Sequence, residues 1–133
     1  MGKKKILIID NYIDFINQNK VVLEENGFEV MSASSSREGM EKVPFEMPDI
    51  ILLELTLEKH DAGFDVAKAI KADPRFKGIP LLMVTSAAGE TGCDFCQELD
   101  GYWMKTDDFV NKPVTPEELI KRINILLEKA GKA

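Results

Sequence analysis

Five polar side chains that suit phosphoryl chemistry follow short apolar runs of this sequence. Asp10 and Asn11 come directly after the first run, and Glu54, Thr85 and Lys112 follow three later ones. Carboxylates hold hard divalent cations such as Mg²⁺ through oxygen, while a hydroxyl and an ammonium bind phosphoryl oxygens. Any of these residues alone is typical of a strand end or a helix cap. Together they indicate a site that positions and neutralises a phosphoryl group.

The elements that must position these residues alternate between apolar runs and amphipathic segments, which is typical of a parallel sheet with helices on both faces. The run at residues 6–9 is apolar throughout and too short for a helix, which indicates a strand buried on both faces. Ligands of such sheets bind beyond the carboxyl ends of the strands, so the two carboxylates, the hydroxyl and the ammonium should converge on one crevice. The expected strands cover residues 6–9, 28–33, 50–53, 81–84 and 109–111.

Helical spacing and capping residues predict the helices between these strands. The last helix has the clearest signals, with Thr115 as N-cap, Pro116 at the first position and Glu118 completing a capping box. It is expected to end near Ala130. A first helix is expected through residues 15–23, with a stop at 26–27, and a second from a serine cap at 34–36 to an end before Pro44 or Pro48. A third is expected through residues 66–70, with a stop at 73–74, and a short fourth around 94–99.

The composition predicts a single domain, residues 1–133, which is long enough to bury a core without disulfides or metals. The net charge is −6 and the basic run is limited to residues 3–5, which argues against a surface for nucleic acid or an anionic membrane. The apolar run that follows is too short for a signal peptide or a membrane span. Because the sequence shows two cysteines and no export signal, we expect a cytoplasmic protein.

Four segments of the sequence resemble the receiver domain of two-component response regulators. They are residues 5–11 (KILIIDN), 48–55 (PDIILLEL), 80–86 (PLLMVTS) and 107–113 (DDFVNKP), and the resemblance covers nearly the whole chain. It implies a flavodoxin-like (βα)5 fold, an α/β three-layer sandwich around a parallel five-stranded sheet in the order 2-1-3-4-5. It also implies phosphorelay signal transduction through protein contacts. No P-loop, G-x-S-x-G or dinucleotide-binding motif is present, so we expect no enzymatic activity.

The resemblance assigns roles to individual residues. Asp10 matches the first acidic, metal-associated position of the family, and the backbone carbonyl of Thr56 would be a further ligand to Mg²⁺. Thr85 matches the switch hydroxyl, Lys112 the phosphoryl-binding lysine and Phe109 the aromatic switch position. The bond between Lys112 and the proline after it is expected to be cis, as in such proteins.

The implied partners are proteins. They are a sensor histidine kinase or a downstream signalling protein, and a second copy of the chain could bind through the face formed by the last strand and the last two helices. A direct contact with nucleic acid or with a membrane is not expected, because the chain is acidic.

Two residues depart from the family's pattern. Asn11 at the second acidic position removes a negative charge, so Mg²⁺ should bind more weakly. Glu54 stands at the phosphoacceptor position, which is normally an aspartate and also a metal ligand together with Asp10. Its carboxylate reaches about 1.5 Å further, whereas a misplacement of about 1 Å can cost roughly a hundredfold in rate. We hypothesise that Glu54 pairs with Lys112 and biases the domain towards an active-like state; the alternative is a non-switching binding module of the same fold.

Other residues leave further possibilities open. Cys93 and Cys96 form a C-x-x-C motif, which would suit a redox or metal-responsive protein, although the expected topology is not that of thioredoxin and zinc would need two more ligands. The segment between Glu54 and Gly63 is about one residue longer than usual, and His60 within it is expected to face solvent. The aromatic and methionine residues at 102–104 suit either a partner-binding surface or the core.

Overall fold

The computed structural model of the chain describes residues 2–57, 62–85 and 107–131. Their five strands form one parallel sheet in the order β2-β1-β3-β4-β5, which confirms the predicted fold class. The helix expected around 94–99 lies outside the described residues. The strands are β1 (Lys5–Ile9), β2 (Glu29–Ala33), β3 (Ile50–Leu53), β4 (Leu81–Thr85) and β5 (Asp108–Asn111), and the described helices are α1 (Ile13–Glu25), α2 (Ser36–Glu46), α3 (Ala62–Ala72) and α6 (Pro116–Lys129).

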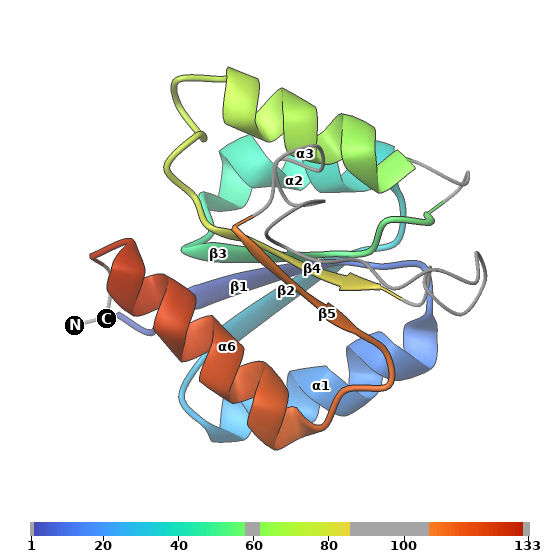
Figure 1. Cartoon of the computed structure of the whole chain (residues 1–133), viewed down its shortest axis with the longest axis vertical. Coiled ribbons are helices and arrows are strands. Elements are labelled where there is room, and N and C mark those ends of the chain that lie inside the picture. Colours follow the sequence, from blue (N-terminus) through green and yellow to red (C-terminus); the bar gives the residue numbers. More distant parts are fainter. Residues whose placement is uncertain (1, 58–61, 86–106, 132–133) are drawn as a thin grey trace.

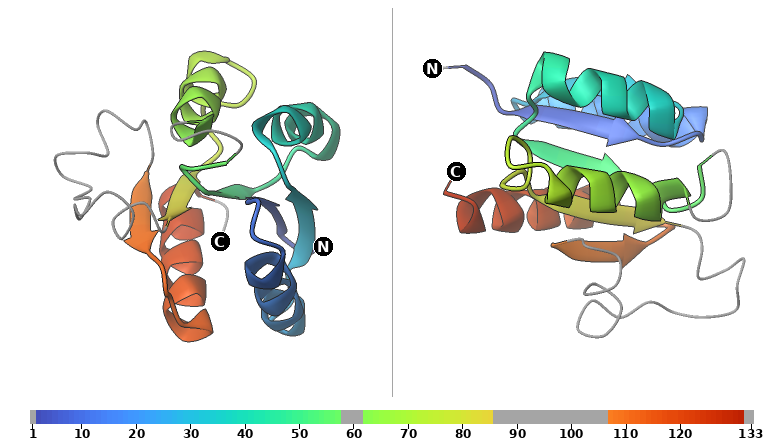
Figure 2. Two further views of the ribbon diagram at one scale, coloured as in Figure 1. Left: turned by 90° about the vertical axis from the view of Figure 1, so that its right-hand side faces the viewer. Right: turned by 90° about the horizontal axis from the view of Figure 1, so that it is seen from above.

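Helices cover both faces of the sheet, with α2 and α3 on one side and α1 and α6 on the other (Figure 1, Figure 2). The strands are apolar throughout because successive side chains point to opposite faces and both faces are buried. In β1, Leu7 and Ile9 belong to the core under α2 and α3, whereas Ile6 and Ile8 belong to the core under α1 and α6. All four side chains are fully buried.

Several element boundaries differ by one or a few residues from the sequence prediction. Of the two ends predicted for α2, before Pro44 or before Pro48, the second is confirmed: α2 continues to Glu46, and Met47 after it has the left-handed conformation at φ 46°. A proline in the last turn removes a single backbone donor, and the helix tolerates this loss here. Strand β2 begins one residue later than predicted, because the N–H of Phe28 donates to the Leu23 carbonyl at the end of α1.

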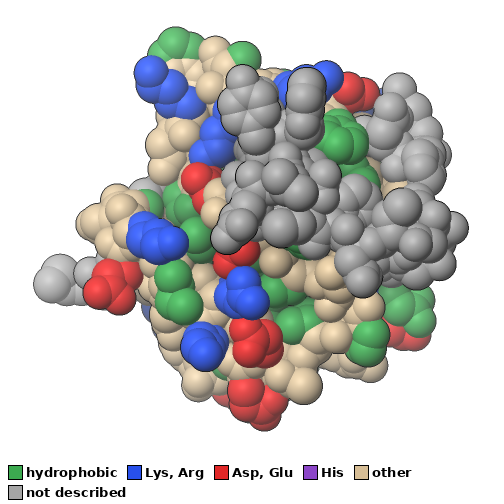
Figure 3. All heavy atoms as spheres, viewed as in Figure 1, with side chains coloured by type: hydrophobic (Ala, Val, Ile, Leu, Met, Phe, Trp, Pro, Cys, Tyr) green, Lys and Arg blue, Asp and Glu red, His purple; other side chains and the backbone are tan. Residues whose placement is uncertain are grey.

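Thr115 as the N-cap of the last helix and Pro116 at its first position are confirmed. The Thr115 hydroxyl accepts a hydrogen bond from the N–H of Glu118 at 3.2 Å, and an apolar stripe of α6 is buried against the sheet. Towards solvent, Arg122 pairs with Glu118 on the same helix and with Asp108 on β5, at 2.7 and 2.8 Å. Charges of both signs lie next to each other on the face shown in Figure 3.

Within the described ranges, no helix combines the length and apolar character that crossing a bilayer needs.

Candidate functional site

The carboxyl ends of β1, β3, β4 and β5 bring four polar side chains into direct contact. Asp10, Glu54 and Thr85 are buried, at 1%, 2% and 0% exposure, and the ammonium of Lys112 reaches the two acids from the loop after β5. Parallel strands place these positions at one edge because they run in register, for example with Ile9 opposite Leu53. The convergence expected from the sequence is therefore present in the structure.

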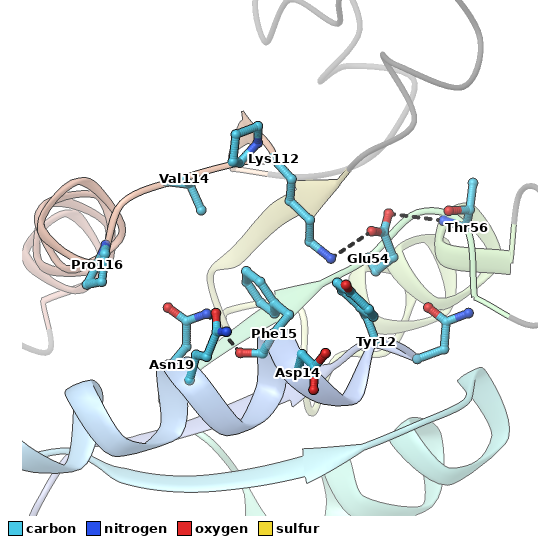
Figure 4. A pocket seen from close by; sticks show the side chains of 12 residues that line it. Tyr12, Asp14, Phe15, Asn19, Glu54, Thr56, Lys112, Val114 and Pro116 are labelled. Carbon is cyan, nitrogen blue, oxygen red and sulfur yellow. Dashed lines mark hydrogen bonds and ion pairs between the residues drawn. The ribbon is translucent and has the colours of Figure 1, made fainter.

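Both carboxylate oxygens of Glu54 are engaged. Oε1 forms an ion pair with Lys112 Nζ at 3.1 Å. Oε2 accepts hydrogen bonds from the hydroxyl of Thr85 and from the N–H of Thr56 at 3.3 Å. Figure 4 shows the Lys112 side chain pointing towards Glu54, with Thr56 on the far side of the carboxylate. Glu54 therefore joins the ends of β3, β4 and the loop after β5.

Lys112 has partners on three sides. Its ammonium lies 2.7 Å from Asp10 Oδ2 and 3.1 Å from Glu54 Oε1. The ring of Phe15, in the first turn of α1, lies beneath it with its centroid 4.2 Å from Nζ, and the Tyr12 ring lies at 5.9 Å. A cation over an aromatic face at the shorter distance is attracted by the ring's quadrupole. This set of contacts holds the ammonium inside the site.

The buried position of Asp10 changes the pKa of its carboxyl. Burial raises the pKa of its carboxyl above the ordinary value, and the negative charge of Glu54 adds to the rise; the hydrogen bond and charge of Lys112 and the N–H of Tyr12 act in the opposite direction. The Tyr12 N–H donates to Asp10 Oδ1 at 2.9 Å. A buried acid kept next to a second acid in this way depends on its counter-ion.

The donors present do not fit the Mg²⁺ ion that the family resemblance implies. All four carboxylate oxygens of Asp10 and Glu54 already accept a hydrogen bond or an ion pair. The amide nitrogen of Asn11 donates to the Leu57 carbonyl at 3.0 Å, and the residue carries no charge. The N–H of Thr56, next to the carbonyl expected as a ligand, is bonded to Glu54. Mg²⁺ is usually held by one or two carboxylates together with waters, and here the ammonium of Lys112 already pairs with one oxygen of each acid.

Gly63 is a positioning residue that the sequence analysis did not identify. Its N–H donates to the Leu55 carbonyl at 2.7 Å. A Cβ at this position would lie 2.4 Å from the Glu54 carbonyl oxygen and 2.6 Å from Leu55 Cα. The first turn of α3 thus lies directly against the backbone that carries Glu54, and only glycine allows this approach.

A cavity of about 700 Å³ opens beside the site, between α1 and the loop from β5 to α6. Its wall includes Phe15, Asn19 and Val114 together with Glu54 and Lys112. Phe15 and Asn19 were not predicted as site residues, because their spacing indicates only a helix face. In this fold, the first turns of α1 lie beside the loop after β5, and this proximity could have indicated that Phe15 and Asn19 line the site.

The remaining predicted residues fall into two groups. The peptide bond between Lys112 and Pro113 is cis, as the resemblance implied. Phe109 is buried, at 8% exposure, in the core under α2 and α3, and its switch role stays a prediction. His60, Cys93, Cys96 and residues 102–104 lie outside the described residues. Among those described, no group of three histidine, cysteine or acidic side chains could hold a metal ion.

Comparison with known sequences defines the class of the protein. The sequence model described as "Response regulator receiver domain" matches residues 6–124. The chain therefore belongs to the receiver domain family of two-component response regulators.

Relatives and solved structures agree with this assignment. The chain is 29% identical over 131 residues to the phosphate regulon transcriptional regulatory protein PhoB of Pseudomonas aeruginosa, covering 98% of this chain and 55% of that protein. It is 32% identical over 128 residues to the DNA-binding dual master transcriptional regulator RpaA of Synechocystis, covering 96% and 51%. The structure of the chemotaxis response regulator CheY4 of Vibrio cholerae matches with a TM-score of 0.81 and 25% identity, over 95% of this chain and all of that one. The chain spans about half the length of the curated relatives it matches.

Proposed function

We propose that this receiver domain signals through protein contacts without a phosphorylation step, and that Glu54 supplies permanently the negative group that phosphorylation would add. The supporting observation is the pair of contacts made by its carboxylate. Lys112 and the Thr85 hydroxyl, which the family resemblance assigns to the phosphoryl group, both bind Glu54. Glu54 thereby holds the ends of β3, β4 and the loop after β5 in one arrangement.

The same contacts make Glu54 a poor phosphoacceptor. A nucleophilic carboxylate must approach phosphorus in line, and an error of about 1 Å can cost roughly a hundredfold in rate. The longer side chain moves the carboxylate by about 1.5 Å. It is also buried, with both oxygens bonded. A carboxylate replaces only part of the charge and acceptors of a phosphoryl group, so the bias is smaller than phosphorylation would give.

The proposed partners are a sensor histidine kinase or a downstream signalling protein, with no enzymatic step by this chain. The face of β5 and α6 that carries Asp108, Glu118 and Arg122 is the described part of the surface proposed for contact with a second copy. Binding of DNA is stated in the name of RpaA, and this chain spans only about half of that protein's length. We propose protein contacts as the output of the domain itself.

Treatment with acetyl phosphate and Mg²⁺ tests the absence of a phosphoryl step. Intact mass spectrometry should detect no phosphoryl group on the parent protein, whereas Glu54→Asp should acquire one. Glu54→Gln, which cannot be phosphorylated at this position, serves as the matched control. A stable phosphoryl group on Glu54 of the parent would contradict the proposal.

The active-like bias needs a second readout. In amide NMR spectra, the signals of Thr85 and Phe109 in the parent should resemble those of Glu54→Asp with beryllofluoride more than those of untreated Glu54→Asp. If the parent, Glu54→Asp and Glu54→Gln give the same signals in this region, the domain is a non-switching binding module instead.

A further inference from the structure

The ammonium of Lys112 occupies the space between two buried carboxylates. Nζ lies 2.7 Å from Asp10 Oδ2 and 3.1 Å from Glu54 Oε1, with the lysine side chain 12% exposed and each acid 2% exposed. A charge at this depth is tolerated only where opposite charges and hydrogen bonds replace its hydration. The three groups therefore depend on one another.

We propose that the Lys112 ammonium is the built-in counter-ion of the Asp10–Glu54 pair and takes the place of the divalent cation at this receiver site. The inference rests on the proposed phosphorylation-independent function and extends it to the metal. A single ammonium supplies the positive charge and the donors that the two acids need. The domain keeps this arrangement without Mg²⁺ and has little affinity for it.

Entry of a metal ion would require Lys112 to leave. Mg²⁺ takes near-octahedral oxygen coordination at about 2.0–2.1 Å, so it would have to replace donors that the two acids already have. If the Lys112 ammonium stayed 3.1 Å from Glu54, it would repel the metal ion, since the ammonium and the metal ion are both positively charged. Asn11 adds no charge to attract it, and its amide nitrogen is bonded to the Leu57 carbonyl.

The length of Glu54 and the ring of Phe15 make the lysine's position stable. Glu54 reaches Lys112 and Thr85 at the same time, which a carboxylate retracted by one methylene, about 1.5 Å, would do less well. The Phe15 ring lies 4.2 Å below the ammonium and closes the side facing α1. Shortening Glu54 should therefore loosen the lysine and admit a metal ion.

Titration with Mg²⁺ and Mn²⁺ chlorides tests this inference. Isothermal calorimetry, and the EPR signal of free Mn²⁺, should show no saturable binding to the parent up to about 10 mM. Lys112→Met, which keeps an apolar stem and removes the charge, should bind Mn²⁺ at least about tenfold more tightly than the parent, because the two acids then lack a counter-ion. Mn²⁺ should also raise the melting temperature of this variant.

Lys20→Met is the matched control, since Lys20 is exposed on α1 and its removal changes the net charge equally without touching the site. It should bind no more metal than the parent. Saturable binding to the parent below about 10 mM, or no gain in folded Lys112→Met, overturns the inference. If Lys112→Met does not fold, Glu54→Asp decides the question: a gain of Mn²⁺ binding supports the inference and no gain overturns it. These readouts do not depend on phosphorylation. Metal binding to the parent would overturn this inference alone, whereas a phosphoryl group on Glu54 would overturn the proposed function alone.

Discussion

Removal of the Lys112 ammonium is expected to destabilise the fold more than any other single lysine substitution considered for this chain. Asp10 and Glu54, each 2% exposed, would be left next to each other without their cation. Breaking a buried ion pair by removing one partner costs about 3–5 kcal/mol. For a domain of this size this corresponds to a fall in melting temperature of roughly 10–20 °C. Urea denaturation of Lys112→Met at neutral pH measures the loss.

The loss should depend on pH in a defined direction. Burial already raises the pKa of the Asp10 carboxyl above its ordinary value of 3.8, and Lys112 lowers it, so removing the lysine raises this pKa further. A folded state with a raised carboxyl pKa binds more protons than the unfolded chain between the two pKa values. Its stability therefore falls as the pH rises from the unfolded value through the folded one. The difference between parent and variant should be smallest near pH 4 and largest at neutral pH.

The control is Lys20→Met, whose stability should stay within about 0.5 kcal/mol of the parent because the side chain is exposed. A neutral-pH loss for Lys112→Met no larger than that of the control would contradict the counter-ion role. A loss of equal size at every pH would show that the effect comes from packing of the lysine stem.

Three further substitutions test how the fold supports the site. Gly63→Ala should lower stability by about 1–3 kcal/mol in urea denaturation, because its Cβ would lie 2.4 Å from the Glu54 carbonyl oxygen; an unchanged midpoint would show that α3 can move away at no cost. Lys71→Met should lower the stability by about 1–3 kcal/mol in thermal denaturation, because the Lys71 ammonium donates to two backbone carbonyls and to Asp107. A loss below about 0.5 kcal/mol would show that these contacts contribute no more than an ordinary surface ion pair. Ser35→Ala should cost about 1 kcal/mol in guanidinium denaturation, because its hydroxyl caps α2, and Ser35→Thr should recover most of the loss.

The strands could be predicted from the sequence because the physics that forms them is local and repetitive. The runs at 6–9 and 50–53 are fully apolar, and both faces of the sheet bury them. Boundaries were less predictable where two local preferences compete. Pro44 favours a helix end, yet the helix already formed by residues 36–43 continues past this proline to Glu46. The sequence pattern alone does not show whether Pro44 ends the helix or the helix continues through it.

The meeting of Asp10, Glu54, Thr85 and Lys112 could also be predicted, because parallel strands place their carboxyl ends at one edge. The contacts within the site could not be predicted in the same detail. Pairing of Glu54 with Lys112 was a hypothesis, but the simultaneous bond from Lys112 to Asp10 depends on rotamers that spacing does not specify. The Phe15 ring under the ammonium depends in turn on how α1 packs against the sheet.

Asn11 and Glu54, which the resemblance marks as departures from the family pattern, both affect the balance of charge around Lys112. An aspartate at position 11 would place a third acid near the single ammonium of Lys112, whereas Asn11 leaves two. An ionised carboxylate could not donate to the Leu57 carbonyl as the Asn11 amide does at 3.0 Å, because it is an acceptor only. That bond fastens the segment directly after Glu54, where the Thr56 N–H donates to the Glu54 carboxylate. Asn11 thus favours the same arrangement as Glu54, in which the Glu54 carboxylate is held from its own loop and binds Lys112.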